Sequence, residues 1–449
     1  MKRILIHNAT LVNEGREERG SLIIEGDHIS DILSADVPIQ LPYDEMIDAT
    51  GCYLIPGVID EHVHFREPGL THKADILSES RAAAAGGVTS IMDMPNTFPM
   101  TVTLKALEEK QRLLEKKCIV NHSCYFGATN DNYKLLAHLD TQRVCGVKLF
   151  MGSSTGNMLV DQAESLIHIF ESSPILIAAH CEDQNIINQN AQRYAERYGG
   201  ADRVPMSKHY NIRSGEACFN STKLAVRMAQ DTGARLHVMH ISTARELALF
   251  SSAPLTPKKM ITAEACIGHL NFDQKDVQRL GTRIKCNPSI KRRSDANGLL
   301  EAINEGRIDV IATDHAPHLL TDKEGGALTA ASGMPLIQFS LVSMLNLVDE
   351  GFLTITKLVE KMCHAPAALY QIERRGFIRK GYKADLVMLR PGAPWILTDS
   401  DIRSKCGWSP FEGRTFRWRV EKTFANGHLI YNNGQVDMSY RGEALRFVR

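Results

Sequence analysis

The sequence has no excess of charge of either sign, because Lys+Arg and Asp+Glu both total 52 among its 449 residues. A chain without net charge has no general attraction to nucleic acid or to a membrane surface, so we expect neither as a partner. No apolar run approaches the roughly 20 residues that span a bilayer, and the N-terminus lacks the long apolar core of a signal peptide. The ten cysteines form no CxxC pair, which indicates buried thiols in a reducing compartment, so a cytoplasmic location is expected.

Between residues 56 and 370, apolar β-branched runs alternate with longer helical stretches. Helices are predicted over residues 103–117, 161–171, 215–231 and 242–250. Eight runs have strand character: residues 57–65, 89–95, 118–126, 144–150, 175–180, 235–240, 260–266 and 309–314. Eight strands separated by helices predict an α/β fold of the (β/α)8 TIM-barrel type. An open doubly wound sheet shows the same alternation, but it would gather its polar residues near one switch point.

Both ends of the chain consist of short strand-like runs and turns. Residues 21–24 and 28–33 predict a hairpin, and Asn426-Gly427 is a turn signal between two apolar runs near the C-terminus. The simplest architecture combines residues 1–55 and 371–449 into one small β-sandwich domain. That domain would lie beside a catalytic barrel formed by residues 56–370.

The carboxyl ends of the predicted barrel strands carry polar residues. His62 and His64 end the first strand, and they point to the same face because side chains alternate along a strand. Four later strands carry Lys148, His180, His240 and Asp314 near their ends. A barrel places its active-site residues at these strand ends. We therefore expect the six side chains to lie together, which favours the barrel over the open sheet.

The types of these side chains indicate a metal site. Imidazole and carboxylate groups suit zinc, and no cysteine is placed to join them. One zinc ion is expected at His62, His64 and Asp314, and a second at His180 and His240.

Lys148 is the candidate for a bridge between the two ions. Its ammonium would repel a metal, but reaction of the amine with CO2 gives a carbamate, which is an anionic bidentate ligand. The alternative is an ordinary lysine that pairs with a carboxylate at the mouth of the barrel. The sequence leaves both alternatives open.

Arg66 follows His64 by two residues. A planar guanidinium binds a carboxylate through two parallel hydrogen bonds, so Arg66 predicts an anionic substrate. The alternative is a structural ion pair between Arg66 and the adjacent Glu67.

These motifs together resemble those of a known family. The segment from Pro56 to Gly69, with its core His62-Val-His64-Phe-Arg66-Glu-Pro-Gly69, is similar to the signature of dihydroorotases in the amidohydrolase superfamily. The other matching motifs follow in the family's order: Asp93-Met-Pro-Asn96, Val147-Lys148-Leu-Phe150, Ala179-His180-Cys-Glu182, Met239-His240-Ile-Ser242, Asn287-Pro288 and Ala312-Thr-Asp314-His-Ala-Pro-His318. The resemblance extends from residue 4 to about residue 430. It departs from the usual pattern at Ser289, where many relatives have a second proline, and at Ile267-Gly-His269, where many have two histidines.

The resemblance implies a zinc-dependent cyclic amidohydrolase that interconverts N-carbamoyl-L-aspartate and L-dihydroorotate in pyrimidine biosynthesis. It implies two zinc ions per subunit, bridged by a carboxylated Lys148 and a hydroxide, and a homodimer. Asp314 would be the catalytic acid–base group as well as a metal ligand. Residues expected to bind the small-molecule substrate are His64, Arg66, Asn96, Asn287, His318, Ser332 and Gly333.

Three other functions remain open. An allantoinase or hydantoinase would share the metal ligands, but its substrate has no ring carboxylate, so Arg66 discriminates against it. A non-catalytic relative that serves as an assembly scaffold would be expected to have lost ligands, whereas this chain keeps them. A metal-dependent deaminase on the same barrel fits the Lys148 motif less well.

Overall fold

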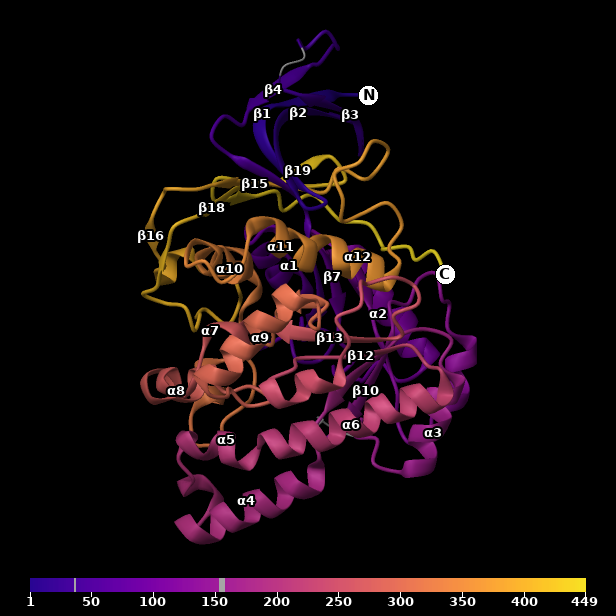
Figure 1. Cartoon of the computed structure of the whole chain (residues 1–449), viewed down its shortest axis with the longest axis vertical. Helices are drawn as coiled ribbons and strands as arrows, with labels where there is room; N and C mark the ends of the chain where they lie inside the picture. The colour runs from indigo at the N-terminus through magenta and orange to yellow at the C-terminus, as the bar shows by residue number, and fades with distance from the viewer. Residues whose placement is uncertain (36–37, 153–157) are drawn as a thin grey trace.

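The computed structural model describes residues 1–35, 38–152 and 158–449. Strands from the two ends of the chain lie together at one end of the molecule, indigo and yellow in Figure 1, and the barrel with its helices forms the rest. Among the described residues, no helix has both the length and the apolar character needed to cross a membrane.

The barrel strands are β6 (Val58–Val63), β7 (Val88–Asp93), β8 (Asn121–Cys124), β9 (Phe126–Gly127), β10 (Val147–Met151), β11 (Ile177–Cys181), β12 (Leu236–Val238), β13 (Ile261–Cys266) and β14 (Val310–Ala312). Neighbouring strands pair in parallel, in sequence order. The third predicted strand is divided into β8 and β9, which pair with β7 and β10 respectively. The ring closes where His64 N donates to His315 O at 2.7 Å. All eight predicted strands and the TIM barrel are confirmed.

Burial explains why these runs are apolar on both faces. Every residue of β6, β7, β10 and β11 is buried, since one face of each strand fills the barrel interior and the other packs against helices. Polar residues in these strands therefore need specific hydrogen-bond partners. The polar residues lie mainly toward the carboxyl ends of the strands.

The helices are α1 (Ile76–Ala85), α2 (Leu104–Lys117), α3 (Ala163–Ser172), α4 (Gln184–Tyr198), α5 (His209–Ile212), α6 (Gly215–Thr232), α7 (Ile267–Asn271), α8 (Gln274–Leu280), α9 (Arg293–Glu305), α10 (Ser340–Asp349), α11 (Ile355–Val359) and α12 (Ala365–Tyr370). The predictions over 103–117, 161–171 and 215–231 are confirmed. The prediction over 242–250 is wrong in type, because Ala244–Leu249 is a 3₁₀ helix. Thr243 and Glu246 form a capping box at its start, a motif that also begins α-helices and so does not distinguish the two.

The terminal strands are β1 (Arg3–Asn13), β2 (Arg16–Glu25), β3 (His28–Ser34), β4 (Glu45–Asp48), β5 (Tyr53–Pro56), β15 (Leu386–Arg390), β18 (Arg419–Ala425), β19 (His428–Asn432) and β20 (Gln435–Val436). They form one nine-stranded sheet in which β5 pairs with β1 on one side and β15 on the other. Ile29 of β3 exchanges hydrogen bonds with Gly381 and Tyr382, which precede β15. The sheet therefore curves back on itself, and its two halves are continuous rather than two separate sheets.

Part of the segment 371–449 packs on the barrel rather than in this sheet. Two short strands, β16 (Trp395–Ile396) and β17 (Thr415–Phe416), form a separate hairpin. Near the end of the chain, Leu445 N donates to His122 O, and the Arg449 guanidinium donates to Val144 O and Cys145 O at the start of β10. The C-terminus thus closes the face of the barrel opposite the strand ends that carry the polar residues.

Candidate active site

One cavity of about 290 Å³ lies at the carboxyl ends of the barrel strands. All the residues assigned to metal or substrate from the sequence line it: His62, His64, Arg66, Asn96, Lys148, His180, Asn287, His240, Asp314, His318, Ser332 and Gly333. Phe150, Ala316 and Ala331 complete the lining. The structure thus brings together side chains that come from strands around the whole barrel.

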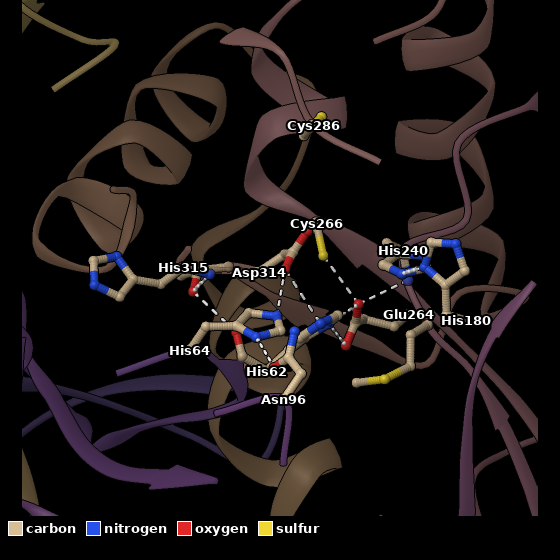
Figure 2. A network of polar contacts seen from close by, with 12 residues as sticks. His62, His64, Asn96, His180, His240, Glu264, Cys266, Cys286, Asp314 and His315 are labelled. Carbon is tan, nitrogen blue, oxygen red and sulfur yellow. Dashed lines mark hydrogen bonds and ion pairs between the residues drawn. The ribbon is translucent and has the colours of Figure 1, made fainter. Parts of the chain in front are cut away.

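The first group of ligands converges on one point. His62 Nε2 lies 3.3 Å and His64 Nε2 lies 3.1 Å from the same Asp314 oxygen. The Nδ1 atom of His62 faces Glu264 at 3.0 Å, and that of His64 faces Asn96 Oδ1 at 2.7 Å. These partners require each Nδ1 to carry the proton, so both Nε2 lone pairs point at the shared centre, as metal ligation requires (Figure 2).

The second group is the pair His180 and His240. His180 Nδ1 lies 2.8 Å from His240 Nε2, and His180 Nε2 lies 2.9 Å from Glu182 (Figure 2 shows the two rings together). Glu182 also accepts hydrogen bonds from Arg213. Because Glu182 accepts a hydrogen bond from the Nε2–H of His180, His180 Nδ1 presents its lone pair to His240, and a cation between the two rings suits this arrangement.

The charge states of these groups also fit a metal. Burial lowers the pKa of His64 to about 4 and lowers the pKa of His180 and His240, so these three imidazoles are neutral and able to ligate. Burial opposes ionisation of Asp314, but His62 and His64 outweigh it and keep its pKa below the ordinary value. The site therefore offers neutral imidazoles and an ionised carboxylate, the donor set that zinc prefers.

Backbone conformation at this end of the barrel is unusual. Arg66, His240 and Asp314 have φ values of 68°, 41° and 51°. Non-glycine residues in the left-handed region cost about 1–3 kcal/mol each and cluster at functional sites. At three strand ends, this strained backbone conformation accompanies a side chain that lines the cavity.

Lys148 is buried, with 1 % of its surface exposed. Its Nζ donates to the Met239 sulfur at 2.8 Å and lies 4.8 Å from the centre of the Phe150 ring. It forms no ion pair with a carboxylate in the described part of the chain, so the structure argues against an ordinary lysine–carboxylate pair. Burial lowers the pKa of Lys148 to about 8, which favours the neutral amine that reacts with CO2.

Arg66 supplies a cation to the same cavity. Its Nε donates to Pro317 O at 3.0 Å, and one terminal nitrogen lies 3.0 Å from His318 Nε2. Glu67 pairs instead with Lys117 and accepts from Ile76 N. Within residues 1–35, 38–152 and 158–449, no carboxylate pairs with Arg66, so the structural ion pair with Glu67 is not formed.

Gly333 lines the cavity, but both of its backbone polar groups are already in use. Its N–H donates to Lys285 O at 2.8 Å, and its carbonyl accepts from Lys323 at 2.8 Å. A side chain at this position would meet Ala316 O at 2.4 Å, and φ is +140°. Gly333 therefore shapes the loop. Its expected backbone contact with substrate stays a prediction, and its carbonyl, which has a second lone pair, is the group that can still make it.

Several polar residues that support the site were not predicted. Glu264 orients His62 and also accepts from His240 N at 2.7 Å. Glu182 and Arg213 orient His180, and Lys73 Nζ lies 3.1 Å from His318 Nδ1. The sequence did hold a signal for the two carboxylates, because Glu182 shares a strand face with His180 and Glu264 interrupts an apolar strand.

We expect Glu264→Gln to lower zinc affinity by about 10–100-fold, the usual effect of removing a partner of a ligating histidine. The amide keeps one carbonyl acceptor, but it removes the negative charge that faces His62 Nδ1 and replaces the second oxygen, 3.2 Å from that nitrogen, by an NH2 group that cannot accept. Zinc retained during dialysis against a competing chelator measures this. Glu246→Gln is the matched control, since Glu246 is equally buried but binds Thr222 and Thr243. Equal zinc retention by both variants would contradict the assignment.

Fold and site together define a barrel hydrolase with histidine and carboxylate metal ligands at its strand ends. Residues 53–430 match the amidohydrolase family, and the chain belongs to that family. Its relatives include the dihydroorotase of Methanosphaera stadtmanae, 30% identical over 93% of this chain and 94% of the relative. The dihydroorotase of Syntrophus aciditrophicus is 31% identical over 96% of this chain and 99% of the relative.

Solved structures agree on the fold. The L-hydantoinase (dihydropyrimidinase) of Arthrobacter aurescens superposes with a TM-score of 0.92 at 26% identity, over 99% of this chain and 100% of the other. The dihydropyrimidinase of Brevibacillus agri has a TM-score of 0.88 at 21% identity and covers both chains completely. The second match concerns the fold alone. The chain is thus a metal-dependent cyclic amidohydrolase, and its sequence relatives include dihydroorotases.

Proposed function

We propose that this chain is a dihydroorotase, which hydrolyses the ring amide of L-dihydroorotate and, in reverse, closes N-carbamoyl-L-aspartate for pyrimidine biosynthesis. The observation that carries the proposal is Arg66, a buried guanidinium without a carboxylate partner among the described residues, in the same cavity as the metal ligands. A cyclic amide with a ring carboxylate needs both groups.

A first zinc ion would be held by His62, His64 and Asp314, and a second by His180 and His240. When bound, zinc supplies Lewis-acid activation of water and of the amide carbonyl. We propose that a carboxylated Lys148 joins the two sites. Its amine nitrogen would attack CO2 and lose a proton, which forms an anionic carbamate. Burial of Lys148 beside Met239, without a carboxylate partner in the described residues, supports this.

Asp314 is proposed as the group that moves the proton. It lies between His62 and His64 and faces the cavity. Its lowered pKa keeps it ionised at neutral pH, so it can accept a proton from the attacking water and return it to the leaving ring nitrogen. Ring closure uses the same steps in reverse.

Arg66 and Asn96 are proposed to hold the ring carboxylate. Because Asn96 Oδ1 accepts from His64 Nδ1, its amide N–H groups are directed elsewhere and can donate to an anion. This contact also links substrate binding to the orientation of a metal ligand. His318, Asn287 and Ser332 border the same part of the cavity and are proposed to contact the ring.

The second candidate is a hydantoinase, favoured by the structural match to L-hydantoinase at 26% identity. Hydantoin-type substrates lack the ring carboxylate. An unpaired guanidinium in the cavity would then lose its hydration without gaining a partner, which costs binding free energy.

The deciding experiment measures hydrolysis of L-dihydroorotate, allantoin and dihydrouracil on one preparation, together with zinc per chain by elemental analysis. We expect turnover of dihydroorotate alone and about two zinc ions, as two-metal amidohydrolysis requires. One zinc ion with the same selectivity would contradict the Lys148 bridge and leave the function in place. Turnover of allantoin or dihydrouracil without dihydroorotate would overturn the proposed substrate.

We also propose a cytoplasmic homodimer. All ten cysteines are buried free thiols, which supports a reducing compartment. The dimer rests on the resemblance to dihydroorotases and is checked by the molar mass in solution.

A further inference from the structure

A loop of three residues, Ala331 to Gly333, forms one wall of the cavity. Behind it lies Lys323, the last residue of a 3₁₀ helix, Leu320–Lys323, with 2 % of its surface exposed. Lys323 does not line the cavity, and no step of the proposed reaction uses it.

The Lys323 ammonium is bound by three backbone carbonyls. Its Nζ lies 3.0 Å from Lys285 O, 2.8 Å from Ala331 O and 2.8 Å from Gly333 O. An ammonium has three N–H donors, so each carbonyl receives one. Lys285 O also accepts a hydrogen bond from Gly333 N, so the loop and the ammonium bind the same carbonyl.

No carboxylate neutralises Lys323 in the part of the chain that the structure describes. The adjacent Asp322 carboxylate turns away and faces Lys73, at 3.4 Å, and Leu319 N, at 3.1 Å. A buried ammonium without a counter-ion costs free energy, and an apolar side chain would fill the same space at lower cost. What an apolar side chain could not do is orient the three carbonyl groups, and the ammonium does this through its three N–H donors.

The loop in turn positions two residues of the cavity. Ser332 O lies 3.1 Å from His318 Nε2, and Ser332 Oγ donates to Asn287 Oδ1 at 3.1 Å. Ser332 is flanked by the two loop carbonyls that Lys323 holds. A change in the orientation of those two carbonyls would therefore move Ser332 and, through its hydrogen bonds, His318 and Asn287.

We propose that Lys323 is a positioning residue for substrate binding, which holds the Ala331–Gly333 loop so that Ser332, His318 and Asn287 face the dihydroorotate ring. The assignment of the ring rests on the proposed function. Lys323 touches neither the substrate nor a metal ligand, so it should affect KM and leave kcat and zinc content nearly unchanged.

The protonation of Lys323 provides an independent readout. Burial, together with the Lys285 and Arg66 cations, lowers its pKa to about 7 against the opposing effect of the Asp322 carboxylate. Below that pKa the ammonium serves all three carbonyls. Above it the neutral amine has two N–H groups, and one carbonyl loses its donor. The KM of the wild-type enzyme should therefore rise as the pH increases from 6 to 9.

The test compares wild type, Lys323→Met and Lys323→Gln, all loaded with zinc, over pH 6 to 9. We expect Lys323→Met to raise the KM for dihydroorotate by about 10–100-fold, as loss of charge-assisted hydrogen bonds does. Its kcat should stay within about threefold, and its KM should lose the pH dependence of the wild type. Lys361→Met is the control, because Lys361 is also a buried lysine but pairs with Glu360, and neither residue lines the cavity.

A KM within about twofold of the wild type in a folded, zinc-loaded variant would overturn the positioning role. If Lys323→Met does not fold, Lys323→Gln replaces it in the test, because its amide N–H still donates to a carbonyl and supports the loop in part. A wild-type enzyme without turnover of dihydroorotate would overturn the proposed function instead, so the two failures are distinguishable.

Discussion

Asp314→Asn is expected to reduce turnover of dihydroorotate by at least about 10³–10⁴-fold, the upper range for loss of a general acid–base group. The amide cannot take a proton from water at neutral pH, and it removes the negative charge that faces His62 and His64. Steady-state hydrolysis of dihydroorotate measures the effect. Zinc per chain, measured on the same sample, separates loss of the proton carrier from loss of metal.

Asp309→Asn is the matched control for Asp314. Asp309 adjoins the other end of β14, is more deeply buried than Asp314, and pairs with Lys259 at 2.7 Å. Its replacement should lower the melting temperature, because it leaves Lys259 without its ion-pair partner, but it should preserve turnover per folded chain. Full turnover by Asp314→Asn at normal zinc content would remove Asp314 from the mechanism.

Arg66→Met is expected to keep zinc and to lose most of the affinity for dihydroorotate. A charge-assisted hydrogen bond is worth about 1.5–3 kcal/mol, so KM should rise by about 10–150-fold. The variant should also lose its preference for dihydroorotate over dihydrouracil, because the latter has no ring carboxylate to bind. Competition binding and kcat/KM for the two substrates measure this.

Arg66→Lys tests whether the geometry of the cation matters. Lysine keeps the charge but cannot bind a carboxylate with two parallel N–H groups, so it should restore only part of the affinity. Normal binding of dihydroorotate by Arg66→Met would contradict the role of Arg66 and would leave the hydantoinase alternative open.

Much of the fold was predictable because its signals are local. Apolar runs flanked by helical stretches identified all eight barrel strands, and strand alternation put His62 and His64 on one face. The 3₁₀ helix Ala244–Leu249 was mistaken for an ordinary helix, since the capping signal at Thr243 is common to both. The curved single sheet was not predictable either, because pairing between β5 and β15 joins residues more than 300 positions apart.

The barrel, the ligand types and the cation at Arg66 could be predicted because each depends on residue type and on spacing within one strand or turn. The partners of those side chains depend instead on how distant parts of the chain pack together. Glu67 binds Lys117 rather than Arg66, Glu264 orients His62 from across the barrel, and Lys323 holds a loop that its own segment does not contain. Such contacts depend on where separate strands and loops meet, and hydrogen-bond distances are set by that packing rather than by any local pattern.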